Sequence, residues 1–273
     1  MAASGSPAAG SGTTRGVSPC CTAGVPPRWV IGLLVAGCAG GPPPNVRLGT
    51  GPVPESARLH APPDPVFRPA RPGFGPLGLG SPRDALLFVP EEARSRRVPL
   101  LVMLHGAGGS AARIWDTVRS DAEERGVAVL LPESRRWSWA FREGDFGEDR
   151  RFIDAALEET FRRVPVEGGH VALGGFSAGA TMALSLGASN GDLFGWVFAF
   201  SPTGIAVTGQ VGHPRFLVAH GLQDELVPIA SSSRAIVPAL RSAGYRVVYR
   251  ELPGEHMIFP EAVHEAFSLL VGD

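Results

Sequence analysis

Three side chains in the second half of the sequence have the types and the order needed for nucleophilic catalysis. Ser177 lies in a G-x-S-x-G pattern at 175–179, Asp224 follows a later apolar run, and His256 follows the last such run. A serine hydroxyl is a poor nucleophile at neutral pH and needs a base that a third group orients. We therefore expect His256 to take the Ser177 proton and Asp224 to hold the imidazole in place.

The local context of Ser177 favours this interpretation over a chance match. The apolar run 171–174 directly precedes the pattern, and a stretch typical of a helix begins at Ala178. A serine on a sharp strand–turn–helix connection has its hydroxyl exposed at the end of a sheet, next to a helix N-terminus. The alternative is a glycine-rich helix start in which the serine is only a cap.

Other residues compete for the acid and base roles. Asp224 could instead be a turn residue that caps the next helix, and Glu225 is its neighbour. His264 lies within an amphipathic stretch and is expected on the surface. His105 and His220 each precede a glycine at the end of an apolar run, so we interpret them as residues that shape loops.

Acyl-transfer chemistry also needs two N–H donors for the developing oxyanion. One is expected from Ala178, the residue after the serine, and the other from the glycine-rich segment 105–109. We assign the second donor to Ala107, with Gly108 as the alternative. The segment does not match a phosphate-binding P-loop, because G-x-x-x-x-G-K-[ST] is absent and all 25 basic residues are arginine.

The elements that would position these residues alternate along 82–273. Apolar runs that are short and uninterrupted predict a mostly parallel sheet covered by helices on both faces, with the site at the carboxyl ends of the strands. We expect strands at 85–89, 99–104, 127–131, 170–174, 196–200, 216–220 and 246–251, and helices at 111–125, 147–163, 178–187, 231–242 and 261–270.

The residues before this domain have a different composition. The segment 1–38 has an apolar run, 29–37, that is shorter than the roughly 20 residues of a membrane-spanning helix, so it predicts a signal peptide. Leu34-Val35-Ala36-Gly37-Cys38 resembles the bacterial lipobox, in which the cysteine is lipidated. We expect an exported, membrane-anchored bacterial lipoprotein, or a cytoplasmic protein if the true start codon lies downstream of Met1. The Pro- and Gly-rich segment 39–81 is expected to be a flexible tether.

Composition limits the partners. The formal net charge is −1, which gives no reason to expect a nucleic-acid partner, because phosphate binding needs a concentrated cationic surface. All three cysteines lie at or before Cys38, so the predicted domain has no disulfide and no thiol nucleophile. We expect no cofactor and no metal, since the sequence has no H-E-x-x-H motif and no Cys/His cluster. The oligomeric state stays open.

Four motifs together resemble the phospholipase/carboxylesterase family of α/β-hydrolases, which includes acyl-protein thioesterase-like enzymes, and the related polyhydroxybutyrate-depolymerase-like esterases. They are LHGAGG at 104–109, LGGFSAGATMALSLG at 173–187, HGLQDELVP at 220–228 and AGYRVVYRELPGEHMI at 243–258. The resemblance implies Ser177, Asp224 and His256 as the triad and a domain with no large cap. Family members often carry a polar residue where this chain has Ala178, but only the backbone N–H acts there.

The substrate is less well defined by the sequence. Trp137, Trp139 and Phe141 lie on a loop after a predicted strand, where they either line an acyl pocket or pack as ordinary loop residues. We expect a serine carboxylic ester hydrolase that acts on small or medium acyl esters. The alternatives are a thioesterase or polyester depolymerase with the same triad, and a catalytically inactive surface-binding lipoprotein.

Overall fold

An eight-stranded sheet forms the centre of the protein, with the strand order β10-β9-β7-β6-β4-β5-β3-β2. The computed structural model describes residues 45–61, 71–140 and 146–272. The strands of this sheet are β2 (Gly73–Pro76), β3 (Leu86–Val89), β4 (Val98–Leu104), β5 (Ala128–Leu131), β6 (Val166–Phe176), β7 (Trp196–Phe200), β9 (Arg215–Gly221) and β10 (Val247–Leu252).

The sheet is parallel from β10 to β5 and becomes antiparallel at β3 and β2. Strands β4, β5 and β7 are buried along their whole length, which explains why their sequences are apolar without alternation. The carboxyl ends of the parallel strands lie at one edge, so the loops after β4, β6, β9 and β10 are brought close together. The mostly parallel sheet predicted from the sequence is confirmed.

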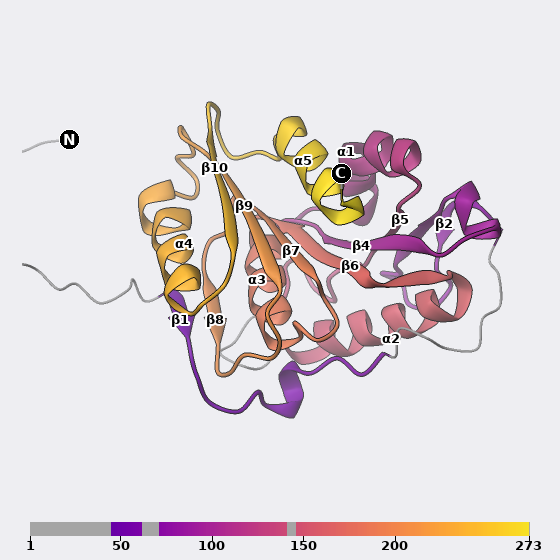
Figure 1. The fold of residues 1–273 in the computed structure, drawn as a ribbon, viewed down its shortest axis with the longest axis horizontal. Helices are drawn as coiled ribbons and strands as arrows, with labels where there is room; N and C mark the ends of the chain where they lie inside the picture. Colours follow the sequence, from indigo (N-terminus) through magenta and orange to yellow (C-terminus); the bar gives the residue numbers. More distant parts are fainter. Residues whose placement is uncertain (1–44, 62–70, 141–145, 273) are drawn as a thin grey trace, which may run out of the picture. The chain divides into compact units, whose positions relative to one another are not determined.

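Helices cover both faces of the sheet (Figure 1). Helices α1 (Ala111–Arg125) and α5 (Pro260–Val271) pack with alternate strand residues such as Leu101 and Val129. Helices α2 (Gly147–Arg163), α3 (Ala178–Ser189) and α4 (Ser233–Ser242) pack with the intervening residues, such as Val102 and Leu130. This division follows from the two-residue period of a strand, whose successive side chains point to opposite faces.

Most predicted helix and strand positions are matched, with differences at some ends. Helix α1 begins after Ser110, whose side chain accepts a hydrogen bond from the Arg113 N–H, and ends at Gly126, which has a φ of 63°. Strand β6 is longer than the predicted 170–174. Helix α4 begins at Ser233 rather than at 231, because a separate 3₁₀ turn, η3 (Ile229–Ser231), precedes it.

The flexible tether predicted for 39–81 is wrong for the described part of that segment. Strand β1 (Val46–Leu48) pairs in parallel with β8 (Ile205–Val207), and β2 pairs with β3. Between them lies a 3₁₀ turn, η1 (Glu55–Ala57); another, η2 (Glu91–Arg94), follows β3. The segment has no apolar periodicity because single residues anchor it, the buried ones being Val46, Ala57, Leu59, Ala61 and Leu77. The folded unit therefore begins before residue 82.

Asn190 holds the first of these segments in place. This residue is buried at the end of α3, and its side-chain oxygen accepts the Leu59 N–H at 2.8 Å while its amide donates to the Ala57 carbonyl at 2.8 Å. Arg58 lies between them and forms a two-point ion pair with Asp192, and this pairing raises the pKa of Arg58. The clamp explains how a segment with little apolar content becomes ordered.

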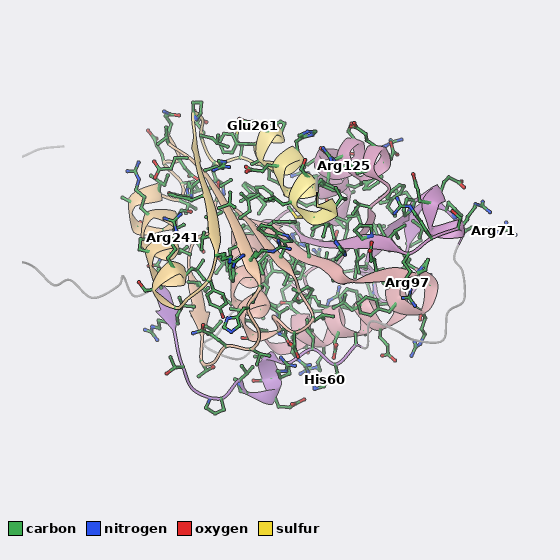
Figure 2. The ribbon with its side chains drawn as sticks, viewed as in Figure 1. His60, Arg71, Arg97, Arg125, Arg241 and Glu261 are labelled. Carbon is green, nitrogen blue, oxygen red and sulfur yellow. The ribbon has the colours of Figure 1, made fainter. Side chains whose placement is uncertain are left out.

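Polar side chains such as His60, Arg241 and Glu261 lie on the surface of the described unit (Figure 2). Among the described residues, no helix is long and apolar enough to cross a membrane. The predicted signal peptide, including Cys38, falls outside the residues that the structure describes.

Candidate active site

Ser177 occupies a sharp turn between β6 and α3. Its φ is 55° and its ψ is −119°, a combination that costs free energy in a residue other than glycine. Its N–H donates to the Phe200 carbonyl at 2.9 Å, which ties the turn to the neighbouring strand β7. A Cβ atom at Gly175 would lie 2.3 Å from the Gly179 carbonyl oxygen, and one at Gly179 would lie 2.4 Å from the His105 carbonyl oxygen. The two glycines therefore allow the strand, the helix and the loop after β4 to approach one another.

The structure brings the three residues predicted for catalysis into one hydrogen-bonded chain. His256 Nε2 lies 3.0 Å from Ser177 Oγ, and His256 Nδ1 lies 2.7 Å from Asp224 Oδ2. In the resting arrangement Nδ1–H donates to the carboxylate, so Nε2 is free to accept the serine proton. The Phe176 ring packs beside the imidazole, with ring centroids 4.8 Å apart, and limits how far His256 can turn.

The carboxylate of Asp224 is buried and has further partners. Its Oδ1 accepts the Val227 N–H at 2.7 Å, and its Oδ2 also lies 3.1 Å from Nε2 of the buried His220. His220 Nε2 also donates to the Val227 carbonyl, so its Nδ1 accepts the Ser233 hydroxyl proton at 2.7 Å. Burial lowers the pKa of His220, which favours the neutral ring. The sequence reading of His220 as a loop-shaping residue missed its contact with Asp224.

Backbone and side-chain contacts join the loop of Asp224 to the loop of His256. The N–H of Gln223 donates to the Gly254 carbonyl, and its side chain accepts the Gly254 N–H. A Cβ at Gly221 would lie 2.3 Å from the Glu255 carbonyl oxygen, which shows how closely the two loops pack. Gly221 in HGLQD and Gly254 in PGEH are the sequence signal that could have indicated this contact.

The loop after β4 lies close to the serine, since a Cβ at Gly106 would lie 3.4 Å from Ser177 Cβ. The Gly108 N–H donates to the Trp137 carbonyl at 2.8 Å, and the Gly109 N–H donates to the Gly106 carbonyl at 2.9 Å. Within the described residues, the N–H groups of Ala107 and Ala178 have no such backbone partner. Of the two donors considered for this loop, the geometry therefore favours Ala107 over Gly108.

The buried ring of His105 holds this loop in place through hydrogen bonds to backbone groups. Its Nε2 accepts the Ser134 N–H at 3.1 Å, so Nδ1 carries the proton and donates to the Gly106 carbonyl at 2.7 Å. Burial lowers the pKa of His105, in keeping with a neutral ring that stays out of proton transfer. Trp139 donates its indole N–H to the His105 carbonyl at 2.6 Å.

A cavity of about 350 Å³ opens beside His256. It is lined by the loop 105–110, by α1 residues Arg113, Ile114 and Thr117, and by Phe176, Met257 and Ile258. Neither of the described tryptophans predicted to line a substrate pocket is among these residues. Trp139 is buried behind the loop, and Trp137 lies against Gly108 with most of its side chain exposed; Phe141 falls outside the described residues.

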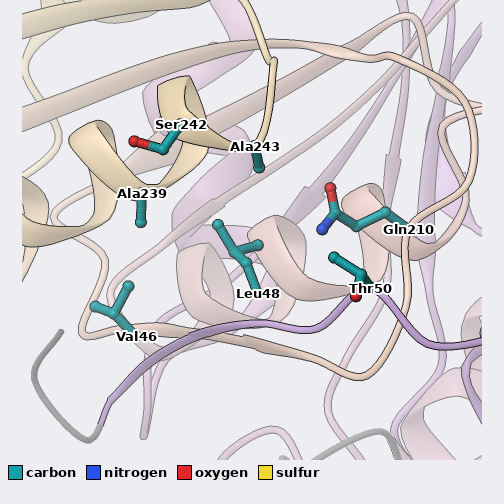
Figure 3. Close-up of a pocket in the computed structure, with 7 residues that line it drawn as sticks. All are labelled: Val46, Leu48, Thr50, Gln210, Ala239, Ser242 and Ala243. Atoms are coloured by element: carbon teal, nitrogen blue, oxygen red, sulfur yellow. The ribbon is translucent and has the colours of Figure 1, made fainter. Parts of the chain in front are cut away.

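Two competing candidates lie apart from this arrangement. His264 contacts Asp121 at 2.9 Å on the exposed surface of α5, as the amphipathic pattern predicted, and Glu225 is exposed. A larger cavity of about 560 Å³ lies between β1 and α4 (Figure 3). The residues that line it carry no titratable group; they are Val46, Leu48, Thr50, Gln210, Ala239, Ser242 and Ala243. Within the described residues, no group of three or more His, Cys, Asp or Glu side chains could hold a metal ion.

Comparisons with known proteins support an esterase-like hydrolase. Residues 142–270 match the profile of the phospholipase/carboxylesterase family. A putative esterase, NocK, from Nocardia uniformis subsp. tsuyamanensis is 30% identical over 155 residues, which cover 52% of this chain and 45% of that protein. The chain thus spans less than half the length of this relative.

Solved structures share the fold. FphF, a fluorophosphonate-binding serine hydrolase of Staphylococcus aureus, is similar with a TM-score of 0.61 and 15% identity, covering 74% of this chain and 100% of FphF. A phospholipase/carboxylesterase from Dyadobacter fermentans gives a TM-score of 0.53 at 18% identity, covering 68% and 95%. The protein therefore has the α/β-hydrolase fold, and its resemblance to the phospholipase/carboxylesterase family, expected from its motifs, is confirmed.

Proposed function

We propose that this protein is a serine carboxylic ester hydrolase that works through an acyl-enzyme, with Ser177, His256 and Asp224 as its triad. The observation that carries the proposal is the continuous chain of contacts from Ser177 Oγ through the imidazole of His256 to the carboxylate of Asp224. His256 takes the serine proton as Oγ attacks the ester carbonyl, then gives it to the leaving alcohol. Water enters next and releases the acid by the same steps.

The oxyanion formed at each step is held by the N–H groups of Ala107 and Ala178. Both groups belong to backbone that the fold fixes, one in the loop after β4 and the other at the start of α3. Donors that are already in position need no reorganisation during the reaction, and losing one typically costs roughly 100- to 1,000-fold in rate.

Two alternatives use the same domain. A thioesterase or a polyester depolymerase would need the same triad, and a surface-binding lipoprotein would need no triad at all. The strained backbone at Ser177 argues against the inactive protein, because such strain persists where the surroundings hold it for a purpose. Small or medium acyl esters are favoured by a cavity of about 350 Å³, which is near the lower end of ligand pockets.

Covalent labelling by a fluorophosphonate tests the mechanism. We expect the wild-type protein and Ser95→Ala, which changes an exposed serine of the η2 region, to be labelled. Ser177→Ala should not be labelled. An unlabelled wild type, or a labelled Ser177→Ala, contradicts the proposal. Rates with 4-nitrophenyl esters, acyl thioesters and polyhydroxyalkanoate then separate the three hydrolase alternatives.

We also propose that the chain is exported and lipidated at Cys38, on the strength of the lipobox-like sequence alone. Metabolic labelling with palmitate should be present in the wild type and absent in Cys38→Ala. Labelling that persists in the variant, or a mature protein that keeps residues before Cys38, rules this out. A protein without a cleaved leader would fit the cytoplasmic alternative.

A further inference from the structure

One face of α1 lines the cavity beside His256. Ser110, Arg113, Ile114 and Thr117 follow the i, i+3, i+4, i+7 spacing that puts residues on one side of a helix, and all four line the cavity. These residues lie beside the cavity because the loop after β4, which carries the proposed oxyanion donor, leads directly into this helix. The face therefore contacts whatever part of a substrate fills the cavity.

Arg113 is the permanent charge in this lining. The remaining side chains of the lining are apolar or neutral, apart from the titratable rings of His105 and His256, and they include Met257 and Ile258. No Asp or Glu lines the cavity within the part of the chain described, and Arg113 forms no ion pair with a described residue. An arginine that is not neutralised beside an apolar wall can attract an anion.

The described carboxylates near Arg113 either have other partners or lie off the face that lines the cavity. Glu133 accepts the Ala111 N–H at 2.7 Å and pairs with Arg83, so both of its oxygens have partners. Asp116 is on the same helix but not on the face that lines the cavity, and Arg119 pairs with Glu123 at 2.8 Å. Arg113 thus differs from Arg119, which is six residues further along α1, because Arg113 lines the cavity and forms no ion pair with a described residue.

We propose that Arg113 makes the enzyme prefer esters that carry an anionic group, such as a carboxylate, a few bonds from the scissile ester. The idea rests on the proposed esterase function and specifies its substrate class. The guanidinium presents two parallel N–H groups to a carboxylate, and the apolar wall accommodates the methylene groups between the anion and the ester. The anion can belong to the acyl part or to the alcohol part, since both are bonded to the ester group that Ser177 attacks beside His256.

Matched ester pairs test the preference. The acyl-side pair is the 4-nitrophenyl monoester of adipate against 4-nitrophenyl hexanoate, and the alcohol-side pair is 4-carboxyphenyl butyrate against phenyl butyrate. The measured quantity is the ratio of kcat/KM for the anionic ester to that for the neutral one, after subtraction of uncatalysed hydrolysis. In at least one pair we expect the ratio to fall about ten-fold in Arg113→Gln and further in Arg113→Glu. The ratio corrects for any general loss of activity in the variants.

Arg119→Gln is the matched control, because it removes an arginine from the same helix but not from the cavity, and its ratio should equal that of the wild type. Raising the ionic strength should lower the wild-type ratio and leave the Arg113→Gln ratio nearly constant, since salt screens the attraction. Turnover of neutral esters with no effect of Arg113→Gln on either ratio overturns this inference and leaves the esterase proposal standing. A wild type that hydrolyses none of the four esters overturns both.

Discussion

Asp224 shares its carboxylate between two histidines, and the two have different roles. His256 reaches Oδ2 from the exposed side and connects it to Ser177, whereas His220 approaches the same oxygen from the buried side, at 3.1 Å. The outer histidine must gain and lose a proton during the reaction. The inner one is held neutral by burial and by its contact with Ser233, so it orients the carboxylate without competing for the proton.

Replacing His220 by phenylalanine should therefore lower kcat without removing the triad. The carboxylate loses a hydrogen-bond donor, and such bonds to charged groups contribute about 1.5–3 kcal/mol, so we expect a decrease of roughly 10- to 100-fold. Ester hydrolysis measured over a range of pH is the test, because a change in how Asp224 supports His256 should also shift the acid limb of the kcat profile. His213→Phe, an exposed histidine, is the control. Wild-type kcat and an unchanged pH profile in His220→Phe would show that Asp224 supports His256 without the contact from His220.

The two buried histidines also predict how stability depends on pH. Burial lowers the pKa of both His105 and His220, so below the ordinary value of about 6.5 the unfolded chain binds more protons than the folded one. The free energy of unfolding should then fall as the pH is lowered from 7 towards 5. Carboxylates that pair with arginine affect stability at lower pH. For example, Arg234 lowers the pKa of Glu251 to about 2.

Urea denaturation at several pH values measures this effect. We expect the midpoint to decrease between pH 7 and 5.5, and to decrease less steeply in His220→Phe, which lacks one of the two groups. A midpoint that increases as the pH is lowered from 7 to 5.5 would contradict the neutral state assigned to both rings.

At the scale of single elements, the connection from β6 to α3 depends on close backbone packing. Gly175 and Gly179 lie where a side chain would overlap backbone atoms, at 2.3 Å and 2.4 Å from the nearest carbonyl oxygens. The nearest atoms at both positions belong to the backbone rather than to the flexible end of a side chain, so moving them costs free energy. The strand–turn–helix connection that bears Ser177 needs the missing Cβ at Gly175, and the packing of α3 against the end of β4 needs the missing Cβ at Gly179.

Gly175→Ala should consequently destabilise the protein by about 1–3 kcal/mol, the usual cost of forcing atoms into a packed region. It should also lower activity, because the turn that bears Ser177 has to move. Gly168→Ala is the matched control on the same strand, since a Cβ there meets no atom within 4 Å. Thermal unfolding and ester hydrolysis of the two variants, compared in parallel, provide the test. Equal effects of the two substitutions would mean that the close approach at Gly175 does not hold in solution.

The sequence was sufficient to predict those elements whose pattern depends only on their own residues. The helix at 111–125 carries its own cap residues, and β4 and β7 are apolar throughout, so each could be predicted from its own residues. Strand β1 could not, because it becomes a strand by pairing with β8, which is more than half the chain away. Its apolar residues are too few to show a period.

The same distinction applies to the candidate site. Ser177, Asp224 and His256 each follow a recognisable strand, so their meeting could be predicted from strand order. The cavity beside them could not, because its lining combines α1 with the loop after His256, and only the folded packing brings these together. The composition of the aromatic loop is compatible with both a pocket lining and ordinary packing, and in the structure Trp139 packs against His105.

At the scale of the whole molecule, the described part of the N-terminal segment belongs to the hydrolase fold. Val46 packs in the core beside α4, and Leu59 is buried at the end of α3, where Asn190 holds its backbone. The segment thereby covers the face of the sheet opposite α1 and α5. A fragment that starts at residue 82, where the alternating pattern begins, would leave these apolar surfaces in water.

Truncation tests this assignment. A fragment of residues 62–273 should be less stable than one of residues 45–273 by at least about 3 kcal/mol, since burying one Val or Leu side chain contributes about 1.5–3 kcal/mol and the cut removes both Val46 and Leu59.

Asn190→Ala in the full chain should cost about 1–3 kcal/mol by leaving the Leu59 N–H and the Ala57 carbonyl unpaired. Arg58→Ala should cost at most about 1 kcal/mol, because its ion pair with Asp192 is partly exposed. Chemical denaturation measures the free energy of unfolding of each variant and fragment. Equal stability of the fragments 62–273 and 45–273 would support the flexible tether that the sequence predicted.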